Sequence, residues 1–182
     1  HSRVGYGLSD SDWGKIADAW NVVTKLHLWI DDRAGLTVES IIRRAKRLKL
    51  EMIVIDYLQL LEGSRARGEN RQEEIAGFSR ALKRAAKQMG LPIIALSQVS
   101  RTIEQRKDKR PMLSDLRESG AIEQDADLVM FLYREAVYGK TEENETRAEL
   151  IVAKHRDGPT GTIPLRFQPE LTLFSPPFED PL

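Results

Sequence analysis

Two polar side chains directly follow short apolar runs, at positions where a phosphate-binding enzyme could use them. Asp56 follows the apolar residues 52–55, and Gln98 follows the run 93–97. In an open α/β sheet, ligands bind beyond the carboxyl ends of the strands. A carboxylate there can hold Mg²⁺ through water, and an amide can position a phosphate group. For either residue alone, capping of a turn is the more common role; the pair favours a phosphate site without being diagnostic of one.

Two basic segments lie shortly after these same runs. Residues 64–71 carry three arginines and one glutamate, and residues 101–110 carry five basic and two acidic side chains. Because both segments should leave the same edge of the sheet, we expect a positively charged rim that could bind a polyanion. A solvated loop without a partner is the alternative for each. Neither segment contains an aromatic residue, so base stacking is not expected, and residues 101–110 are the favoured DNA-binding loop on charge alone.

A third pair of cations lies on a predicted hairpin. Lys154 and Arg156 are two residues apart on a strand and therefore point to the same face. Beside the turn at 157–158 they could reach into a neighbouring subunit. An arginine supplied in this way accelerates phosphoryl transfer by roughly 10³–10⁵-fold. From the residues alone, protection of an exposed edge strand against aggregation is the more common reason for such a lysine.

Length and composition exclude several classes of protein and of functional site. The chain has 182 residues, 28 basic and 28 acidic side chains, three histidines and no cysteine. This length suits one domain with a real core. The absence of cysteine excludes a disulfide scaffold, a thiolate metal site and a cysteine nucleophile, and it fits a reducing cytosol. No apolar run approaches the roughly 18 residues of a membrane span, so no membrane association is expected. Zero net charge argues against a polyanion partner unless the basic charge is local.

The hydrophobic pattern predicts an α/β domain. Helical periodicity with plausible start and stop signals occurs in three segments, 9–23, 37–48 and 71–89. Short apolar runs without alternation, typical of parallel strands covered on both faces, occur at 26–30, 52–55, 93–96 and 128–132. Residues 148–156 and 161–167 predict an antiparallel hairpin whose second arm is confined to an edge by Pro164. We expect one domain over 1–182, with its core at 8–174 and a Pro-rich tail at 175–182.

Four stretches, 53–61, 95–101, 109–134 and 153–161, resemble the bacterial replicative DNA helicases of the DnaB family. The most specific is SDLRESGAIEQDAD, at 114–127. The similarity extends from about residue 8 to residue 174. It implies a RecA-like α/β fold with a mainly parallel sheet flanked by helices, a C-terminal antiparallel hairpin, and truncation at the N-terminal side.

The resemblance also implies roles for individual residues. Asp56 matches the Walker B carboxylate that organises Mg²⁺ through water, and Gln98 matches the glutamine that couples the γ-phosphate of ATP to DNA. Lys154 and Arg156 match the finger pair that reaches the ATP of a neighbouring subunit.

Three further residues match the loop that grips the backbone of single-stranded DNA: Arg117, Glu118 and Gly120. This moves the expected DNA contact about ten residues downstream of segment 101–110.

One departure from the family changes the expected activity. No GxxxxGK[ST] phosphate-binding motif occurs in the sequence. Without the lysine and the backbone N–H groups of this motif, the β- and γ-phosphates of ATP have no binding site. We therefore expect this chain alone to hydrolyse no ATP, whereas the intact protein would be an ATP-dependent helicase.

For the intact protein, the resemblance implies a homohexamer in the bacterial cytoplasm that uses ATP and Mg²⁺ and encircles single-stranded DNA. A helicase loader and a primase are the further partners it implies. Two alternatives remain open. One is a different RecA-like ATPase of DNA repair or recombination, which should lack the LRESG stretch. The other is a non-enzymatic oligomerisation or loader-binding module.

Overall fold

The computed structural model describes residues 7–63, 70–116 and 120–177. The chain divides into two compact units, His1–Ala34 and Gly35–Leu182. The organisation as one domain, with a core at 8–174, stays a prediction.

The described residues of the first unit contain one helix. Helix α1 spans Asp10–Val23 and begins at Ser9, whose side chain accepts a hydrogen bond from the backbone N–H of Asp12. The carboxylate of Asp12 in turn accepts from the N–H of Ser9, which completes a capping box and confirms the predicted start. The strand expected at 26–30 is wrong: these residues form no strand and all are exposed. A strand needs a neighbour to pair its N–H and C=O groups, and this unit has no other strand among its described residues.

The helices of the second unit confirm the periodicity. Helix α2 spans Val38–Leu48 behind the N-cap Thr37, and α3 spans Arg71–Met89. Helix α3 ends at Gly90, which has φ +65° and so adopts the left-handed conformation that glycine accepts at low cost. A short helix α4, Gly120–Asp125, was not predicted. Single 3₁₀ turns occur at Leu58–Leu60, Arg101–Gln105, Leu113–Asp115 and Glu135–Val137.

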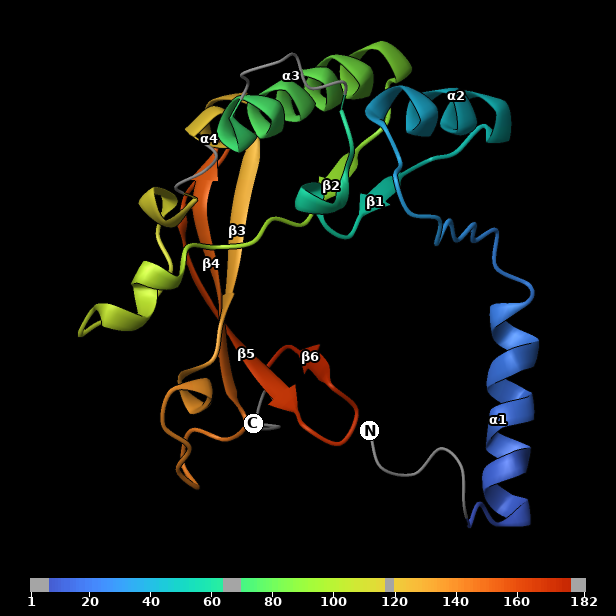
Figure 1. Ribbon diagram of the computed structural model, residues 1–182. Helices are drawn as coiled ribbons and strands as arrows, with labels where there is room; N and C mark the ends of the chain where they lie inside the picture. The colour runs from blue at the N-terminus through green and yellow to red at the C-terminus, as the bar shows by residue number, and fades with distance from the viewer. Residues whose placement is uncertain (1–6, 64–69, 117–119, 178–182) are drawn as a thin grey trace. The chain divides into compact units, whose positions relative to one another are not determined.

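Two sheets form the rest of this unit (Figure 1). Strands β1, Ile53–Ile55, and β2, Ile93–Ala95, pair in parallel. The four-stranded antiparallel sheet has the order β3-β4-β5-β6 and consists of Leu128–Tyr133, Arg147–His155, Gly161–Gln168 and Leu173–Ser175. The α/β class, the parallel pair and the antiparallel hairpin are therefore confirmed.

Strand β3 departs from the prediction. The run at 128–132 was expected in the parallel sheet, but β3 pairs antiparallel with β4. Its residues alternate between exposed and buried, so only one face of the strand is covered. The apolar run looked continuous because the outward side chains are apolar too. On β1, β2, β3 and the residue after β2, the large exposed apolar side chains are Val54, Ile94, Leu96, Leu128, Met130 and Leu132.

Pro164 does not confine β5 to an edge, because β5 lies between β4 and β6. Strand β6 pairs only with Arg166–Gln168 of β5. Pro164 pairs with Glu149 of β4 and lies beyond the part that β6 covers. A proline is tolerated there because β5 is an edge strand locally, with β4 on one side only.

Two apolar clusters hold these elements in place. The first packs α2 and α3 against β1, with Ile53, Phe78 and Leu82 buried in it. The second packs Leu116 against Val129 and Phe131 of β3. Ile122 of α4 contacts both clusters, so α4 lies between α3 and the sheet of β3 and β4 (Figure 1). None of the helices in the described part of the chain is long and apolar enough to cross a bilayer.

Candidate functional site

The parallel pairing of β1 with β2 brings Asp56 and Gln98 to the same edge. Ile55, the last residue of β1, pairs with Ala95, the last residue of β2. Asp56 follows β1 directly, and Gln98 lies three residues beyond β2. The prediction that both residues lie past the carboxyl ends of adjacent strands is confirmed. Their roles in binding a ligand stay a prediction.

Asp56 is exposed at this edge. Within the described ranges, no group of three or more His, Cys, Asp or Glu side chains lies close enough together to hold a metal ion. A cation at Asp56 would therefore take at most two such side chains from this part of the chain and complete its shell with water and phosphate oxygens. Mg²⁺ is commonly bound in this way, so the residues present fit Mg²⁺ held through water.

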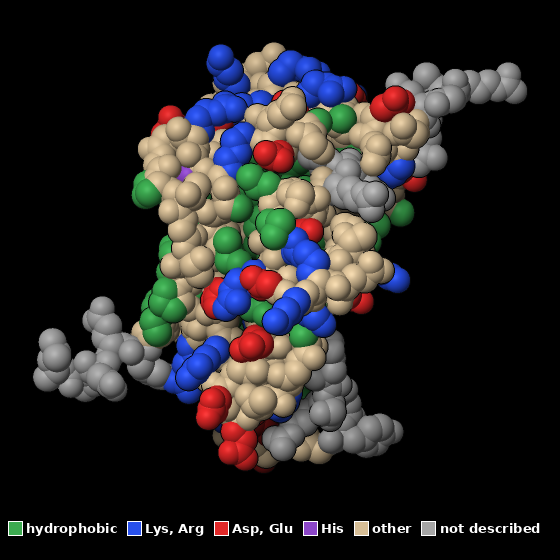
Figure 2. All heavy atoms as spheres, turned by 90° about the vertical axis from the view of Figure 1, so that its left-hand side faces the viewer, with side chains coloured by type: hydrophobic (Ala, Val, Ile, Leu, Met, Phe, Trp, Pro, Cys, Tyr) green, Lys and Arg blue, Asp and Glu red, His purple; other side chains and the backbone are tan. Residues whose placement is uncertain are grey.

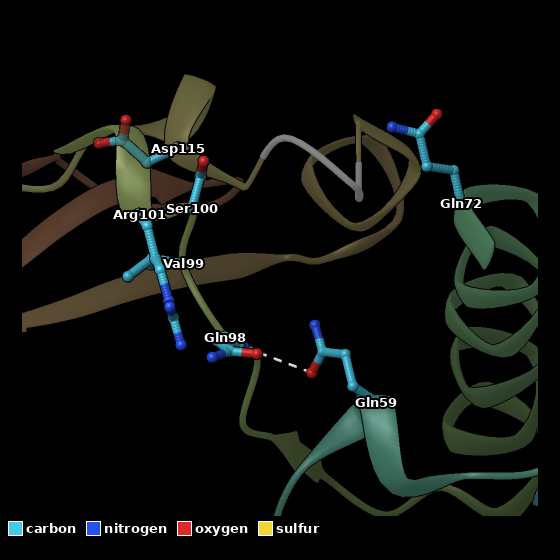
Figure 3. A pocket seen from close by; sticks show the side chains of 7 residues that line it. All are labelled: Gln59, Gln72, Gln98, Val99, Ser100, Arg101 and Asp115. Atoms are coloured by element: carbon cyan, nitrogen blue, oxygen red, sulfur yellow. Dashed lines mark hydrogen bonds between the residues drawn. The ribbon is translucent and has the colours of Figure 1, made fainter.

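Gln98 lies against a second glutamine that the sequence analysis did not single out. The backbone N–H of Gln98 donates to Oε1 of Gln59 at 3.3 Å, as Figure 3 shows. Nε2 of Gln59 donates to Oγ of Ser97 at 3.2 Å. We call these two hydrogen bonds the Gln59 clasp. It joins the turn after β1 to the residues after β2.

A cavity of about 520 Å³ opens beside the Gln59 clasp. Its lining comes from four separate segments of the chain and consists of Gln59, Gln72, Gln98, Val99, Ser100, Arg101 and Asp115 (Figure 3). Amide, hydroxyl and guanidinium groups in such a lining can hydrogen-bond phosphate oxygens or the edges of polar ligands.

The basic segment 101–110 is partly neutralised by acidic neighbours. Nη2 of Arg106 donates to Oδ2 of Asp115 at 2.7 Å, and the side chain of Asp115 is only 6% exposed. The same oxygen accepts from the backbone N–H of Met112 at 2.8 Å. Arg106 therefore fixes the fold of its own loop instead of offering its charge to a partner.

Arg110 has an acidic partner as well. Its guanidinium donates two hydrogen bonds to the carboxylate of Glu149, at 2.7 and 2.8 Å, and lies over the ring of Tyr133. The hydrogen bond from Arg110 lowers the pKa of Glu149 below its usual range. In Figure 2, basic and acidic side chains alternate across the middle of the face shown. Segment 101–110 thus contributes less positive charge to the expected rim than its composition suggests.

Lys154 and Arg156 converge on the C-terminal end of α4. Nζ of Lys154 donates to the carbonyl oxygens of Glu123 and Gln124, the latter at 3.2 Å. Nη2 of Arg156 donates to the carbonyl of Gln124 at 3.2 Å. The last carbonyls of a helix lack partners within the helix and carry partial negative charge, so they bind cations. The prediction that both side chains share one face is confirmed.

Asp127, two residues beyond α4, completes this contact. Its carboxylate accepts from Nη1 of Arg156 at 3.0 Å and also binds Lys83 of α3. Its backbone carbonyl accepts from the N–H of Arg156 at 2.8 Å. The hydrogen bond from Lys83 lowers the pKa of Asp127 below that of a free aspartate. One acidic residue therefore links the end of β4 to two helices.

The predicted DNA loop is described only in part. Gly120 is the exposed first residue of α4. Arg117 and Glu118 lie outside the described residues, as does most of the basic segment 64–71. Because α4 starts at Gly120 and ends against Lys154 and Arg156, it connects the predicted DNA loop to the predicted finger pair.

Sequence reasoning missed three residues that organise this region: Gln59, Asp115 and Asp127. Their partners lie 39, 9 and 29 residues away in the chain, respectively. Only Gln59 had a usable signal, because it follows Asp56 by three residues at the edge where ligands bind.

The parallel strand pair, the helices beside it and the antiparallel sheet place this chain in the α/β class with a RecA-like fold. The model of the family described as "DnaB-like helicase C terminal domain" matches residues 1–176, and the chain belongs to this family. This assignment replaces the alternative of a repair or recombination ATPase.

Individual relatives agree with the assignment. The chain is 50% identical over 171 residues to the replicative DNA helicase DnaB of Geobacillus stearothermophilus, which covers 92% of this chain and 38% of that protein. It is 50% identical over 176 residues to the replicative DNA helicase DnaC of Bacillus subtilis, covering 94% of this chain and 38% of that protein. The chain therefore spans about two fifths of the length of these curated relatives.

Solved structures confirm the fold. One of them, described as an ATPase domain, has a TM-score of 0.88 and 44% identity, over 94% of this chain and 62% of that one. A DnaB-like replicative helicase, solved in a study of its interactions with primase, has a TM-score of 0.90 and 43% identity, over 97% of this chain and 44% of that one.

Proposed function

We propose that this chain is part of the ATPase motor of a hexameric replicative DNA helicase, which unwinds duplex DNA at the replication fork. The observation that carries the proposal is the contact of Lys154 and Arg156 with the end of α4, because α4 starts at the predicted DNA loop. A link of this kind lets the state of a nucleotide alter the grip on DNA. The names of the relatives, replicative DNA helicases at 50% identity, support the same function.

ATP and Mg²⁺ are the ligands that this function requires. Bound Mg²⁺ supplies charge neutralisation for the phosphates, and Asp56 would hold it through water. Gln98 would position the terminal phosphate, since its side chain lies beyond β2 at the same edge as Asp56. The sequence contains no GxxxxGK[ST] motif, so the seat for the β- and γ-phosphates is not among these 182 residues. The chain by itself would therefore hydrolyse no ATP.

Lys154 and Arg156 would act on the nucleotide of a neighbouring subunit. Arg156 is about half exposed, and its partners in this chain are an exposed carboxylate and a helix-end carbonyl. Exposed ion pairs contribute only about 0–1 kcal/mol, so the multiply charged phosphates of a neighbour could displace these partners. Release of Arg156 and Lys154 would then free the end of α4.

DNA would be held through its backbone by the loop at Arg117, Glu118 and Gly120. Backbone contacts carry no sequence information, which suits a motor that must move along any strand. A homohexamer around single-stranded DNA, with a helicase loader and a primase as partners, would work in the bacterial cytoplasm. The primase partner is supported by the similar DnaB-like replicative helicase whose structure was described together with its interactions with primase.

The test uses a full-length helicase in which this chain replaces the matching region of the Geobacillus stearothermophilus relative. We expect DNA-stimulated ATP hydrolysis, and we expect Arg156→Ala to lower it by roughly 10³-fold or more. Arg147→Ala is the matched control, because Arg147 is an exposed arginine at the start of β4, the strand that ends one residue before Arg156. If Arg156→Ala left the rate within twofold of the parent, the assignment of this finger would be wrong.

Mixed rings show whether the finger acts between subunits. Asp56→Ala and Arg156→Ala subunits are each expected to be inactive alone. In a mixture, some interfaces combine an intact Asp56 from one subunit with an intact Arg156 from the next, so activity should return. No recovery in mixed rings of normal size would place Arg156 in its own subunit's site.

A second candidate function is a non-enzymatic oligomerisation or loader-binding module. It is favoured by the exposed apolar side chains on β1, β2 and β3, because apolar surface left exposed on strands can mark an interaction site. Light scattering of the 182-residue chain, with and without single-stranded DNA, distinguishes the two. A defined oligomer that forms without nucleotide or DNA would support the module.

A further inference from the structure

We propose that Gln59 is a positioning residue for Gln98, which it holds through the Gln59 clasp so that the Gln98 side chain is presented to the nucleotide. This inference rests on the proposed function, because it deepens the role assigned there to Gln98. It names a residue that the sequence analysis did not single out.

The first support is that the backbone and the side chain of Gln98 differ in their hydrogen bonding. Its backbone N–H donates to Oε1 of Gln59, whereas its side-chain amide has no hydrogen-bond partner among the described residues. The other end of the Gln59 amide donates to Oγ of Ser97. Both polar atoms of the Gln59 side chain are thus used on the two residues that end the β2 segment. The main chain at Gln98 is fixed, while the amide of Gln98 stays available for a ligand.

The second support is that Gln59 is itself anchored. Nη2 of Arg71 donates to the carbonyl oxygen of Gln59 at 2.6 Å, and the same guanidinium binds Glu74. Glu74 is buried and also accepts from the backbone N–H of Gly63 at 3.2 Å. The turn after β1 is therefore tied to the first turn of α3. A side chain on an anchored backbone can hold another residue in a fixed orientation; a side chain on a loose loop cannot.

The third support is the route from Gln98 toward the predicted DNA loop. Two residues after Gln98, the backbone N–H of Ser100 donates to the carbonyl of Asp115 at 2.9 Å. Asp115 lies directly before Leu116 and Arg117 in the chain. Residues 97–100 are consequently held at one end by Gln59 and at the other by Asp115. Gln59, Gln98, Ser100 and Asp115 line the same cavity (Figure 3). A displacement of Gln98 by a nucleotide would be passed on to the segment that enters the DNA loop.

The clasp itself is tested on the 182-residue chain by amide hydrogen exchange, which does not depend on helicase activity. Gln59→Ala should speed exchange at the Gln98 N–H by about 5- to 10-fold, as expected for loss of one hydrogen bond. Gln59→Glu keeps an acceptor for the N–H of Gln98 and for the hydroxyl of Ser97, so exchange should stay within about twofold. Gln88→Ala, at an exposed glutamine of α3, is the control. Unchanged exchange in Gln59→Ala would overturn the inference.

The functional arm uses the full-length helicase that carries this chain. Gln59→Ala should lower the DNA-stimulated kcat by about 10-fold with KM for ATP changed less than about twofold, since misplacement of a positioned group lowers rate more than binding. Gln59→Glu should recover most of this loss. The double variant Gln59→Ala/Gln98→Ala should be no slower than Gln98→Ala alone, because Gln59 acts through Gln98.

The outcomes separate this inference from the proposed function. If Gln98→Ala loses DNA stimulation and Gln59→Ala stays within twofold of the parent, Gln59 has no positioning role and the proposed function stands. If Gln98→Ala itself keeps full stimulation, the proposed role of Gln98 is wrong and the inference falls with it. Additive losses in the double variant would also contradict the inference, because two independent effects add.

Discussion

The ion pair between Arg106 and Asp115 offers a sharp test of how the site is held together. Asp115 is 5% exposed, and its carboxylate has two donors, Arg106 at 2.7 Å and the N–H of Met112 at 2.8 Å. Arg106→Ala leaves this buried carboxylate with Met112 alone. Removing one partner of a buried pair costs about 3–5 kcal/mol because the other charge stays buried and unpaired. The side chain of Arg106 is 29% exposed, so water can replace part of it, and we expect about 2–3 kcal/mol.

This loss converts to a measurable change in Tm. For a chain of this length, each kcal/mol shifts Tm by roughly 2–4 °C, which predicts a decrease of about 5–10 °C for Arg106→Ala. Circular dichroism of the 182-residue chain during heating reports it. Arg101→Ala is the matched control, because Arg101 is an exposed arginine in the same segment. It should lower stability by less than about 0.5 kcal/mol.

A double-mutant cycle separates the interaction between Arg106 and Asp115 from the other effects of each substitution on stability. Asp115→Ala removes the buried charge itself, so adding Arg106→Ala should then cost much less than it does in the parent. We expect a coupling free energy of at least about 1 kcal/mol between the two substitutions, as found for residues within one network. A decrease in Tm below about 2 °C for Arg106→Ala, together with additive effects in the cycle, would refute the reasoning.

Three further predictions concern the core, the acid response and α4. Ile75 is fully buried, so Ile75→Ala should lower the free energy of unfolding, measured in urea, by about 2–5 kcal/mol and Ile75→Val by about 0.5–1.5 kcal/mol. Equal decreases for the two variants would contradict the burial of Ile75 in the core. Because Arg110 lowers the pKa of Glu149, the ionised carboxylate stabilises the fold above its unfolded-state pKa of about 4.3, and this is lost as pH falls through the lowered pKa. Glu149→Gln should therefore flatten the fall of Tm below about pH 4, and a parallel pH profile would count against the pair. Lys154→Ala uncovers the last carbonyls of α4, so amide exchange within α4 should rise about 2- to 5-fold, and unchanged exchange would show that the contact contributes nothing.

The elements that the sequence predicted well are those stabilised by neighbours in the chain. Helix α1 starts at Ser9 because Ser9 and Asp12 exchange hydrogen bonds over three residues. Helix α3 stops at Gly90 because the left-handed conformation costs glycine little. The buried stripe of α3 follows from helical spacing alone. The convergence of Asp56 and Gln98 also needed only the rule that adjacent parallel strands end at one edge.

The predictions that were wrong share a different cause. Residues 26–30 have the composition of a strand, yet no strand forms, because pairing depends on a neighbour that the residues themselves do not specify. Strand β3 has an apolar run typical of a parallel strand but pairs antiparallel with β4, and its outward side chains stay exposed. Segment 101–110 looked like a free basic rim until Glu149, 39 residues from Arg110, was found beside it.

By itself, the sequence determined helices α1, α2 and α3 with their ends, the α/β class, the family and the residues whose side chains can do chemistry, because each depends on residue type within a few positions or on a specific motif. Only the tertiary structure decided which charges remain available. Arg106 and Arg110 are bound to carboxylates, and Lys154 and Arg156 rest on the end of α4. The clasp of Gln59 on Gln98 likewise joins residues 39 positions apart. The physical reason is that a hydrogen bond forms wherever folding brings donor and acceptor within about 3 Å, whatever their separation along the chain.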